Sequence, residues 1–231
     1  MTCYFTYGEI EKEYLKSKDR KLGAVIDQLG HVNRPADSDV FSSVIHQIIG
    51  QQISTKALAS IWERMQSDLG EISPETLLAA GEERIQAYGT TFHKADYILE
   101  FAEKVKDGRI NLEEIQKLPE EEAQKALISL KGIGPWTAEM ILLFGMQKPD
   151  ILSYGDLAIL RGMRMVYWHR KISRDQFEKY RRRYSPYGST ASIYLWAVAG
   201  GAIPGLTDPA DHKRRRGACS IFQNISRQWE G

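Results

Sequence analysis

Apolar residues recur every three or four positions along most of this chain, the spacing that places them on one face of an α-helix. One such run, YLKSKDRKLGAVIDQLG, ends at Gly30. A longer run begins at Ser38 or Asp39, either of which suits a helix N-cap, and ends at Gly70. No segment shows the clear alternation of apolar and polar residues expected of a half-buried strand. The pattern therefore predicts an all-α protein.

Further helical segments follow Gly70, and two of them carry proline where a helix tolerates it. Pro74 and Pro119 suit the first turn, where the missing backbone N–H would have no helical partner. Later helical segments are TAEMILLFG, DLAILRGMRMVYW, SRDQFEKYRRRY and STASIYLWAVAGG. The chain after Pro204 is polar, basic and less periodic, so its local structure is not predicted.

Length and composition are those of an ordinary globular protein. The chain has 231 residues, a mass of 26.3 kDa and 42% hydrophobic residues, enough for one large domain or two small ones. No apolar run approaches the length of a membrane span, and the N-terminus has no signal-peptide core, so we expect a soluble cytoplasmic protein. Cys3 and Cys219 lie near opposite ends, which argues against a disulfide framework or a thiolate-bound metal. The five histidines lack the spacing of a zinc site.

The net charge of +1 hides an uneven distribution. From Ile151 onward there are 14 Lys and Arg against 6 Asp and Glu, with 17 against 24 before it. Charges act over a screening length of about 10 Å, so a local excess matters more than the total. The basic part, which includes RGMRMVYWHRKISRDQFEKYRRR and KRRR, is either a solvated helix face with a basic tail or a surface that faces phosphate groups.

The segment LKGIGPWTAEM predicts a tight turn between two helices. Gly132 and Gly134 allow backbone conformations that other residues resist, and Pro135 can open the second helix. Backbone N–H groups at the start of that helix would then face outward and could bind an anion such as a phosphate. A plain αα-hairpin turn would also explain the glycines, because short glycine motifs are common.

The surrounding sequence resembles the helix–hairpin–helix (HhH-GPD) DNA glycosylase superfamily. The hairpin is LKGIGPWTA, and GDLA follows with Asp156 twenty positions beyond Trp136. The segment HQIIGQQIS is similar to the family's minor-groove probe, and YSPYGSTASIYLW to its closing pocket helix. The resemblance is strongest to the 3-methyladenine-DNA glycosylase II group.

This resemblance implies two helical subdomains with a DNA-binding cleft between them. Residues 36–148 would form a central subdomain that contains the helix–hairpin–helix at about 121–145. Residues 1–35 and 149–231 would form the second subdomain from both termini, and residues 1–231 together one glycosylase unit.

The resemblance implies that Asp156 is the catalytic carboxylate. A DNA glycosylase breaks the bond between a flipped-out base and its sugar, and a carboxylate beside the sugar stabilises the positive charge that develops there. An alkylated purine is already cationic and can leave without a second acid. An aspartate before a helix is also a common N-cap, and the two roles are compatible.

The family match places Trp136 and Trp196 on the walls of the base pocket, with Tyr187 and Met140 beside them. Bifunctional relatives have a nucleophilic lysine where this chain has Trp136, and an indole cannot form a Schiff base. Stacking of a cationic base on electron-rich rings is worth roughly 0.5–2 kcal/mol. The alternative is that the aromatic residues of SIYLWAVAG belong to a core helix, which is our interpretation of Tyr194.

The resemblance also implies the groups that hold DNA. Gln52, with Ile53 beside it, would enter the vacated base stack, and Gln51 would hold adjacent loops together. Phosphate contacts are expected from Lys131, Gly132, Gly134 and Thr137. Lys131 could instead be a nucleophile, but a loop lysine near phosphate is the stronger interpretation.

No cofactor is expected to be required. A structural Na⁺ or K⁺ could bind the hairpin through the backbone carbonyls of Ile128, Leu130 and Ile133, as the resemblance implies.

The sequence thus predicts a monofunctional DNA glycosylase of base excision repair that removes alkylated purines, such as 3-methyladenine and 7-methylguanine. Its partner would be double-stranded DNA with damaged bases, and we expect a monomer of the bacterial-type cytoplasm, associated with the nucleoid through DNA and not with a membrane. Two alternatives stay open. One is a non-catalytic helix–hairpin–helix DNA-binding protein, and the other is a glycosylase for hypoxanthine, uracil or mismatched thymine.

Overall fold

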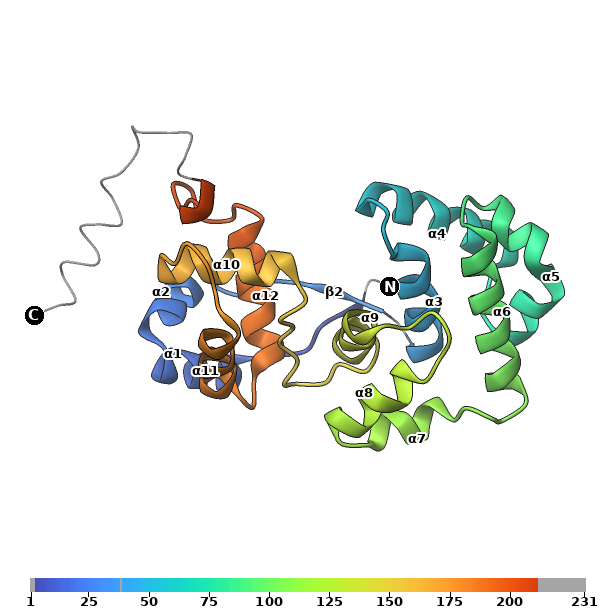
Figure 1. Ribbon diagram of the computed structural model, residues 1–231, viewed down its shortest axis with the longest axis horizontal. Helices are drawn as coiled ribbons and strands as arrows, with labels where there is room; N and C mark the ends of the chain where they lie inside the picture. The colour runs from blue at the N-terminus through green and yellow to red at the C-terminus, as the bar shows by residue number, and fades with distance from the viewer. Residues whose placement is uncertain (1–2, 38, 212–231) are drawn as a thin grey trace, which may run out of the picture. The chain divides into compact units, whose positions relative to one another are not determined.

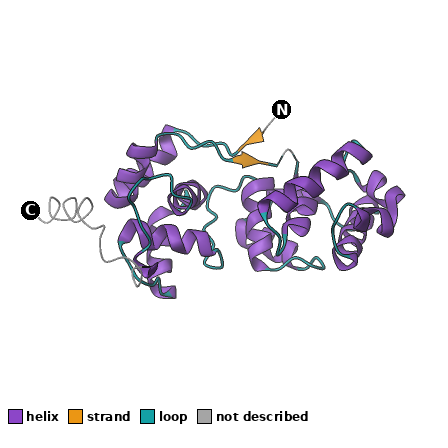
Figure 2. Cartoon of the chain, turned by 90° about the horizontal axis from the view of Figure 1, so that it is seen from above, coloured by secondary structure: helices purple, strands orange, loops and turns teal. Residues whose placement is uncertain are grey.

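The computed structural model describes residues 3–37 and 39–211, and this part of the chain is almost entirely helical (Figures 1 and 2). The prediction of an all-α fold is confirmed. The only strands in these ranges are β1 (Cys3–Tyr4) and β2 (Pro35–Ala36), which pair antiparallel with Cys3 opposite Ala36. The basic KRRR segment and Cys219 lie outside the described residues.

The chain divides into two compact units. Unit 1 comprises the N-terminus up to Phe5 and Pro35–Lys148, and unit 2 comprises Thr6–Arg34 and the chain from Pro149. Because β1 pairs with β2, the first residues belong to unit 1. The chain therefore passes between the units three times, after Phe5, Arg34 and Lys148.

The helices of unit 1 are α3 (Val40–Gly50), α4 (Thr55–Leu69), α5 (Pro74–Ala87), α6 (Phe92–Lys106), α7 (Leu112–Lys117), α8 (Glu120–Ile128) and α9 (Pro135–Met140), which continues into a π-helical turn, η1 (Ile141–Gly145). Unit 2 contains α1 (Glu9–Lys18), α2 (Arg20–Leu29), α10 (Leu157–Tyr167), α11 (Arg174–Tyr184), α12 (Gly188–Ala199) and the 3₁₀ turn η2 (Pro209–Asp211).

Helices begin and end largely where the capping residues indicate. Asp39 caps α3 by accepting the N–H of Ser42 at 2.7 Å. Pro74 is the first residue of α5, whereas Pro119 is the N-cap of α8 rather than part of it. Gly30 and Gly70 end α2 and α4 with positive φ values of 64° and 72°, as expected of glycine at a helix C-terminus.

Two periodic runs that read as continuous helices are broken in the structure. The first is interrupted at Asp19, whose carboxylate accepts the N–H groups of Lys21 and Leu22 and so starts α2. The second is interrupted between α3 and α4, where Gln52 has a φ of 57°. Hydrophobic periodicity does not register these breaks, because the apolar face continues on both sides of each.

Unit 1 packs its helices around α3. Helix α3 contacts α4, α6, α9 and η1. The core is aliphatic, with Ile45, Ile48, Ile49, Leu77, Ile85, Ile98, Leu127, Ala138 and Ile141 all fully buried. Of the two hairpin helices, α9 thus packs directly against α3, and α8 packs against α9.

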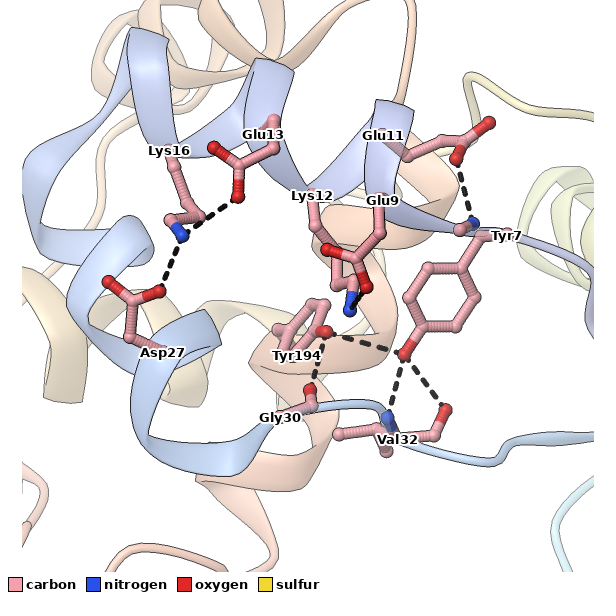
Figure 3. A network of polar contacts seen from close by, with 11 residues as sticks. Tyr7, Glu9, Glu11, Lys12, Glu13, Lys16, Asp27, Gly30, Val32 and Tyr194 are labelled. Atoms are coloured by element: carbon pink, nitrogen blue, oxygen red, sulfur yellow. Dashed lines mark hydrogen bonds and ion pairs between the residues drawn. The ribbon is translucent and has the colours of Figure 1, made fainter.

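Unit 2 is built around α12, which is buried along most of its length and contacts α1, α2, α10 and α11. Tyr194 on α12 is fully buried and its hydroxyl donates to the carbonyl of Gly30 at 2.7 Å. Figure 3 shows this bond beside that of the Tyr7 hydroxyl, which accepts the N–H of Val32 at 2.8 Å. The interpretation of Tyr194 as a core residue is confirmed.

Within residues 3–37 and 39–211, each helix is too short or too polar to span a lipid bilayer.

Candidate active site

Asp156 immediately precedes α10 and is its N-cap. Its Oδ1 accepts the backbone N–H groups of Ala158 at 2.8 Å and Ile159 at 2.9 Å. The residue is only 7% exposed. A carboxylate in this position is held by helix N–H groups that have no helical acceptor and by the positive end of the helix dipole. The local sequence therefore fixes where this oxygen points.

Trp196 on α12 contacts the same carboxylate. Its indole Nε1–H donates to Oδ1 of Asp156 at 3.2 Å. The two helices approach closely at Gly162, where an added Cβ would lie 2.2 Å from the main-chain oxygen of Leu195. Because Leu195 precedes Trp196, this close packing brings the indole to the start of α10. The structure thus brings together two of the residues that the sequence analysis singled out.

Arg34 joins this pair, and nothing in its sequence context indicated that. Its guanidinium carbon lies 5.1 Å from the ring centroid of Trp196, a cation–π geometry. Desolvation lowers the pKa of Arg34, and the negative charge of Asp156 opposes this shift. The residue as a whole is exposed, so solvent also screens these charges and the side chain stays protonated. The cluster in unit 2 is therefore a carboxylate, an indole and a guanidinium.

Tyr187 lies apart from this cluster. It is the N-cap of α12, nine positions before Trp196, which corresponds to about 13 Å along the helix axis. Its ring packs edge-on against Tyr14, with 5.1 Å between the centroids. The pocket role of Tyr187 stays a prediction.

In unit 1 the glycine-rich turn lies between α8 and α9. Gly132 has a φ of 81°, and a Cβ there would lie 2.2 Å from the ring of Tyr97 on α6. Only glycine satisfies both constraints. Gly134 is the N-cap of α9 and Pro135 is its first residue, which confirms the predicted start of this helix.

Lys131, next to Gly132, is ion-paired with α6. Its Nζ lies 2.8 Å from a carboxylate oxygen of Asp96 and 3.2 Å from one of Glu100. Hydrogen bonds to these two carboxylates raise the pKa of Lys131. A phosphate would have to compete with both acids for this ammonium group. The assignment of Lys131 to phosphate binding stays a prediction.

The remaining hairpin residues differ in accessibility. Trp136 is 41% exposed, whereas Met140 is 3% exposed and lies in the interior of unit 1. Thr137 is also buried, and its hydroxyl oxygen accepts from Nε2 of Gln51 at 3.3 Å. Trp136 is therefore accessible to another molecule, and the pocket roles of Trp136 and Met140 stay predictions.

The probe segment is fastened to this hairpin. Nε2 of Gln51 also donates to the carbonyl of Gly132 at 2.8 Å. The interpretation that Gln51 holds adjacent loops together is confirmed. Gln52 is exposed and Ile53 is 37% exposed, so both side chains can reach another molecule.

The carbonyls assigned to a monovalent cation lie along the turn. That of Leu130 accepts the N–H of Ile133 at 3.2 Å, which still leaves the oxygen a second lone pair for a cation. Within residues 3–37 and 39–211, no group of three or more His, Cys, Asp or Glu side chains could hold a metal ion.

Comparison with known proteins finds a matching family and similar relatives. The model described as "HhH-GPD superfamily base excision DNA repair protein" matches residues 45–186. A curated relative, DNA-3-methyladenine glycosylase 1 of Schizosaccharomyces pombe, is 31% identical over 84% of this chain and 87% of its own length.

Solved structures show the same fold. A DNA-3-methyladenine glycosidase from Bacillus halodurans has a TM-score of 0.75 at 30% identity, covering 86% of this chain and 93% of that one. A Schizosaccharomyces pombe 3-methyladenine DNA glycosylase in complex with abasic DNA has a TM-score of 0.72 at 27% identity, covering 83% and 97%. Some curated relatives are longer, and the chain spans 64% of the length of one from Bacillus subtilis.

Proposed function

This chain belongs to the HhH-GPD superfamily of base excision DNA repair proteins, and on that premise we propose that it is a monofunctional DNA glycosylase. Its substrates would be alkylated purines of the 3-methyladenine and 7-methylguanine type in double-stranded DNA. Relatives named DNA-3-methyladenine glycosylase support this substrate class, and the DNA complex of one of them supports a duplex partner.

The observation that carries the proposal is the buried carboxylate of Asp156, held by three N–H donors. In the proposed reaction the damaged nucleotide leaves the stack, and its sugar carbon gains positive charge as the base departs. Asp156 stabilises that charge and orients the water that completes hydrolysis. A cationic purine needs no proton to leave, so one carboxylate suffices. The products are a free base and an abasic site.

The neighbours of Asp156 suit this role. The Trp196 N–H holds the carboxylate in place, while the indole presents an electron-rich face of the kind that attracts a cation. Arg34 already lies against this indole, so a cationic base would have to stack on the other face of the ring or displace the guanidinium.

The hairpin chemistry argues against strand cleavage. Trp136 has no amine with which to form a Schiff base. Lys131 is nearby, but its raised pKa favours the protonated form, which is not nucleophilic. We therefore propose that the abasic strand is left intact.

The decisive variant is Asp156→Asn. Asparagine is an equally good N-cap, so the start of α10 is retained while the negative charge is lost. We expect base release to fall by about 100-fold or more, as for loss of a main electrostatic catalyst, with DNA binding retained. The assay uses oligonucleotides with 3-methyladenine, 7-methylguanine, hypoxanthine or uracil, followed by alkaline strand scission.

Asp39→Asn is the matched control, because Asp39 also caps a helix by accepting a backbone N–H. It should keep parental activity. Full activity in Asp156→Asn would contradict the proposed mechanism. If the wild-type protein released no base from any oligonucleotide, the non-catalytic binding protein would be favoured. Borohydride trapping of the wild-type protein on DNA would show that the chain is bifunctional after all.

We further propose that the protein acts as a monomer on chromosomal DNA in the bacterial-type cytoplasm. A single chain of 26.3 kDa already carries both the hairpin and the carboxylate cluster.

A further inference from the structure

The loop between α3 and α4 holds Gln52 in an unusual conformation. Its φ is 57°, in the left-handed region that a residue with a Cβ seldom adopts. The residue is exposed, so no packing around its own side chain imposes this backbone. Neighbouring groups must hold it, and such a residue is often found where its side chain has a function.

Lys94 on α6 binds the backbone on the N-terminal side of Gln52. Its Nζ donates to the carbonyl of Ile49 at 2.8 Å and to that of Gln51 at 2.7 Å. Carbonyls at the end of a helix have no helical donor, and a positive charge there is favourable. Lys94 lies in the first turn of α6, where its own N–H donates to the Thr91 hydroxyl oxygen at 3.3 Å. The ammonium group thus reaches the loop from a rigid element.

These bonds act directly on the conformation of Gln52. The carbonyl of Gln51 belongs to the peptide plane that joins residues 51 and 52, and φ of Gln52 is the rotation measured from that plane. Lys94 fixes the orientation of this plane. The side chain of Gln51 is fixed separately by its bonds to Gly132 and Thr137. Gln51 is therefore held at its main chain and at its side chain, and the next residue, Gln52, is exposed.

We propose that Lys94 is a positioning residue for Gln52, which it holds in the conformation that lets the glutamine side chain enter a DNA base stack. This inference rests on the proposed function, because it takes Gln52 as the residue that fills the vacated stack. Burial also lowers the pKa of Lys94 through desolvation, as expected of an ammonium group enclosed by the loop.

The test is Lys94→Met, which keeps much of the side-chain length and removes the charge and the donors. Without the two hydrogen bonds from the ammonium group, affinity should fall by at least about tenfold, which corresponds to about 1.4 kcal/mol. We expect that loss for a duplex with a stable abasic-site analogue, measured by fluorescence anisotropy. Base release from duplex DNA should fall more than release from single-stranded DNA, where no stack has to be filled.

Lys148→Met is the matched control. Lys148 also belongs to unit 1, and its Nζ donates to two main-chain carbonyls, those of Gln116 and Leu118, both at 2.8 Å. Its replacement removes the same kind of contact, a lysine ammonium bound to two main-chain carbonyls, but far along the sequence from the probe segment. We expect the ratio of duplex to single-strand activity to stay at the parental value. Lys94→Arg, which keeps the charge and can still donate, should restore most of the binding.

A double-mutant cycle separates positioning from general stability. If Lys94 acts through Gln52, Lys94→Met should have little further effect on abasic-duplex affinity in a Gln52→Ala background. Additive effects, or parental affinity in the single variant, would overturn the inference. Should Lys94→Met fail to fold, Lys94→Gln is measured in the same cycle. Because the binding assay needs no bond cleavage, it still reports on Lys94 if the wild-type protein proves to have no glycosylase activity.

Discussion

At the scale of single residues, the central feature is one carboxylate oxygen that accepts three hydrogen bonds. Two come from the helix that Asp156 caps and the third from Trp196, forty residues further along the chain. A carboxylate held from three sides cannot rotate freely, so it is preorganised for a charge that develops beside it. The indole thus has two roles, as a hydrogen-bond donor at its edge and as an aromatic surface on its face.

We predict that Trp196→Phe separates these two roles. Phenylalanine keeps an aromatic ring but lacks the N–H, so the orientation of Asp156 should suffer more than stacking. The loss of one hydrogen bond to a charged group is about 1.5–3 kcal/mol, which predicts at least about a tenfold decrease in the single-turnover rate of base release. Affinity for the abasic-site duplex should change little.

Trp168→Phe is the control for this substitution, since Trp168 lies at the opposite end of α10 and is 47% exposed. An unchanged rate in Trp196→Phe, or a loss confined to DNA affinity, would contradict the role of the indole N–H.

At the scale of elements, capping groups decide where one helix stops and the next begins. Hydrogen bonds to carboxylates also join neighbouring helices to each other. Asp68 on α4 accepts from Nε and Nη2 of Arg84 on α5, at 2.8 and 2.9 Å, and from the hydroxyl of Tyr88. These bonds, chiefly those from Arg84, lower the pKa of Asp68 to about 2. The ionised carboxylate of Asp68 therefore adds a polar link between α4 and α5.

We predict that Asp68→Asn lowers the urea midpoint of unfolding at pH 7, and that the difference from the parent shrinks in acid. A depressed carboxyl pKa stabilises the fold fully above the unfolded value of about 3.9. This contribution is lost as the pH falls toward 2, where the folded-state carboxyl becomes protonated. The effect should be small because the pair is exposed.

The measurement is a series of urea titrations between pH 7 and pH 3. Glu63→Gln, an exposed position on the same helix α4, is the control for the loss of one negative charge and should leave the urea midpoint at pH 7 close to the parental value. A difference that grows as the pH falls would show that the linkage has the opposite sign.

At the scale of the whole molecule, the two units differ in charge. Unit 1 carries 11 Lys and Arg against 18 Asp and Glu, and unit 2 carries 20 against 12. The near-neutral total therefore conceals an acidic unit, which holds the hairpin, and a basic unit, which holds the carboxylate cluster. Association with DNA should depend on the basic unit through local attraction.

We predict that replacing both Lys179 and Arg182 with Gln weakens the salt dependence of DNA binding. Both residues are exposed on α11, three positions apart and so on the same face. Each lost phosphate contact lowers the slope of log K against log salt by about 0.9, so the pair should lower it by up to about 2. The measurement is duplex affinity across a series of salt concentrations.

Lys106 and Lys117, both exposed in unit 1, provide a control with the same change in net charge when replaced by Gln. Equal slopes for the two double variants would show that only total charge matters, which would exclude α11 as a phosphate-facing surface.

The sequence by itself determined the features that depend on neighbouring residues. The starts of α3, α5 and α9, the glycine turn at Gly132 and the position of Asp156 before α10 all follow from local capping and backbone chemistry. The hairpin motif and the spacing of Asp156 from it also indicated the family and, through it, the proposed chemistry.

Only the tertiary structure decided which distant residues meet. Periodicity shows which face of a helix is buried but not what covers it. The pairing of Asp156 with Trp196 depends on the close approach of α10 and α12 at Gly162, and the contact of Lys94 with Gln51 depends on the packing of α3 against α6. Helix packing likewise set the ring of Tyr187 against Tyr14 and paired Lys131 with acids, because a side chain's partners are set by helix contacts and not by its distance along the chain.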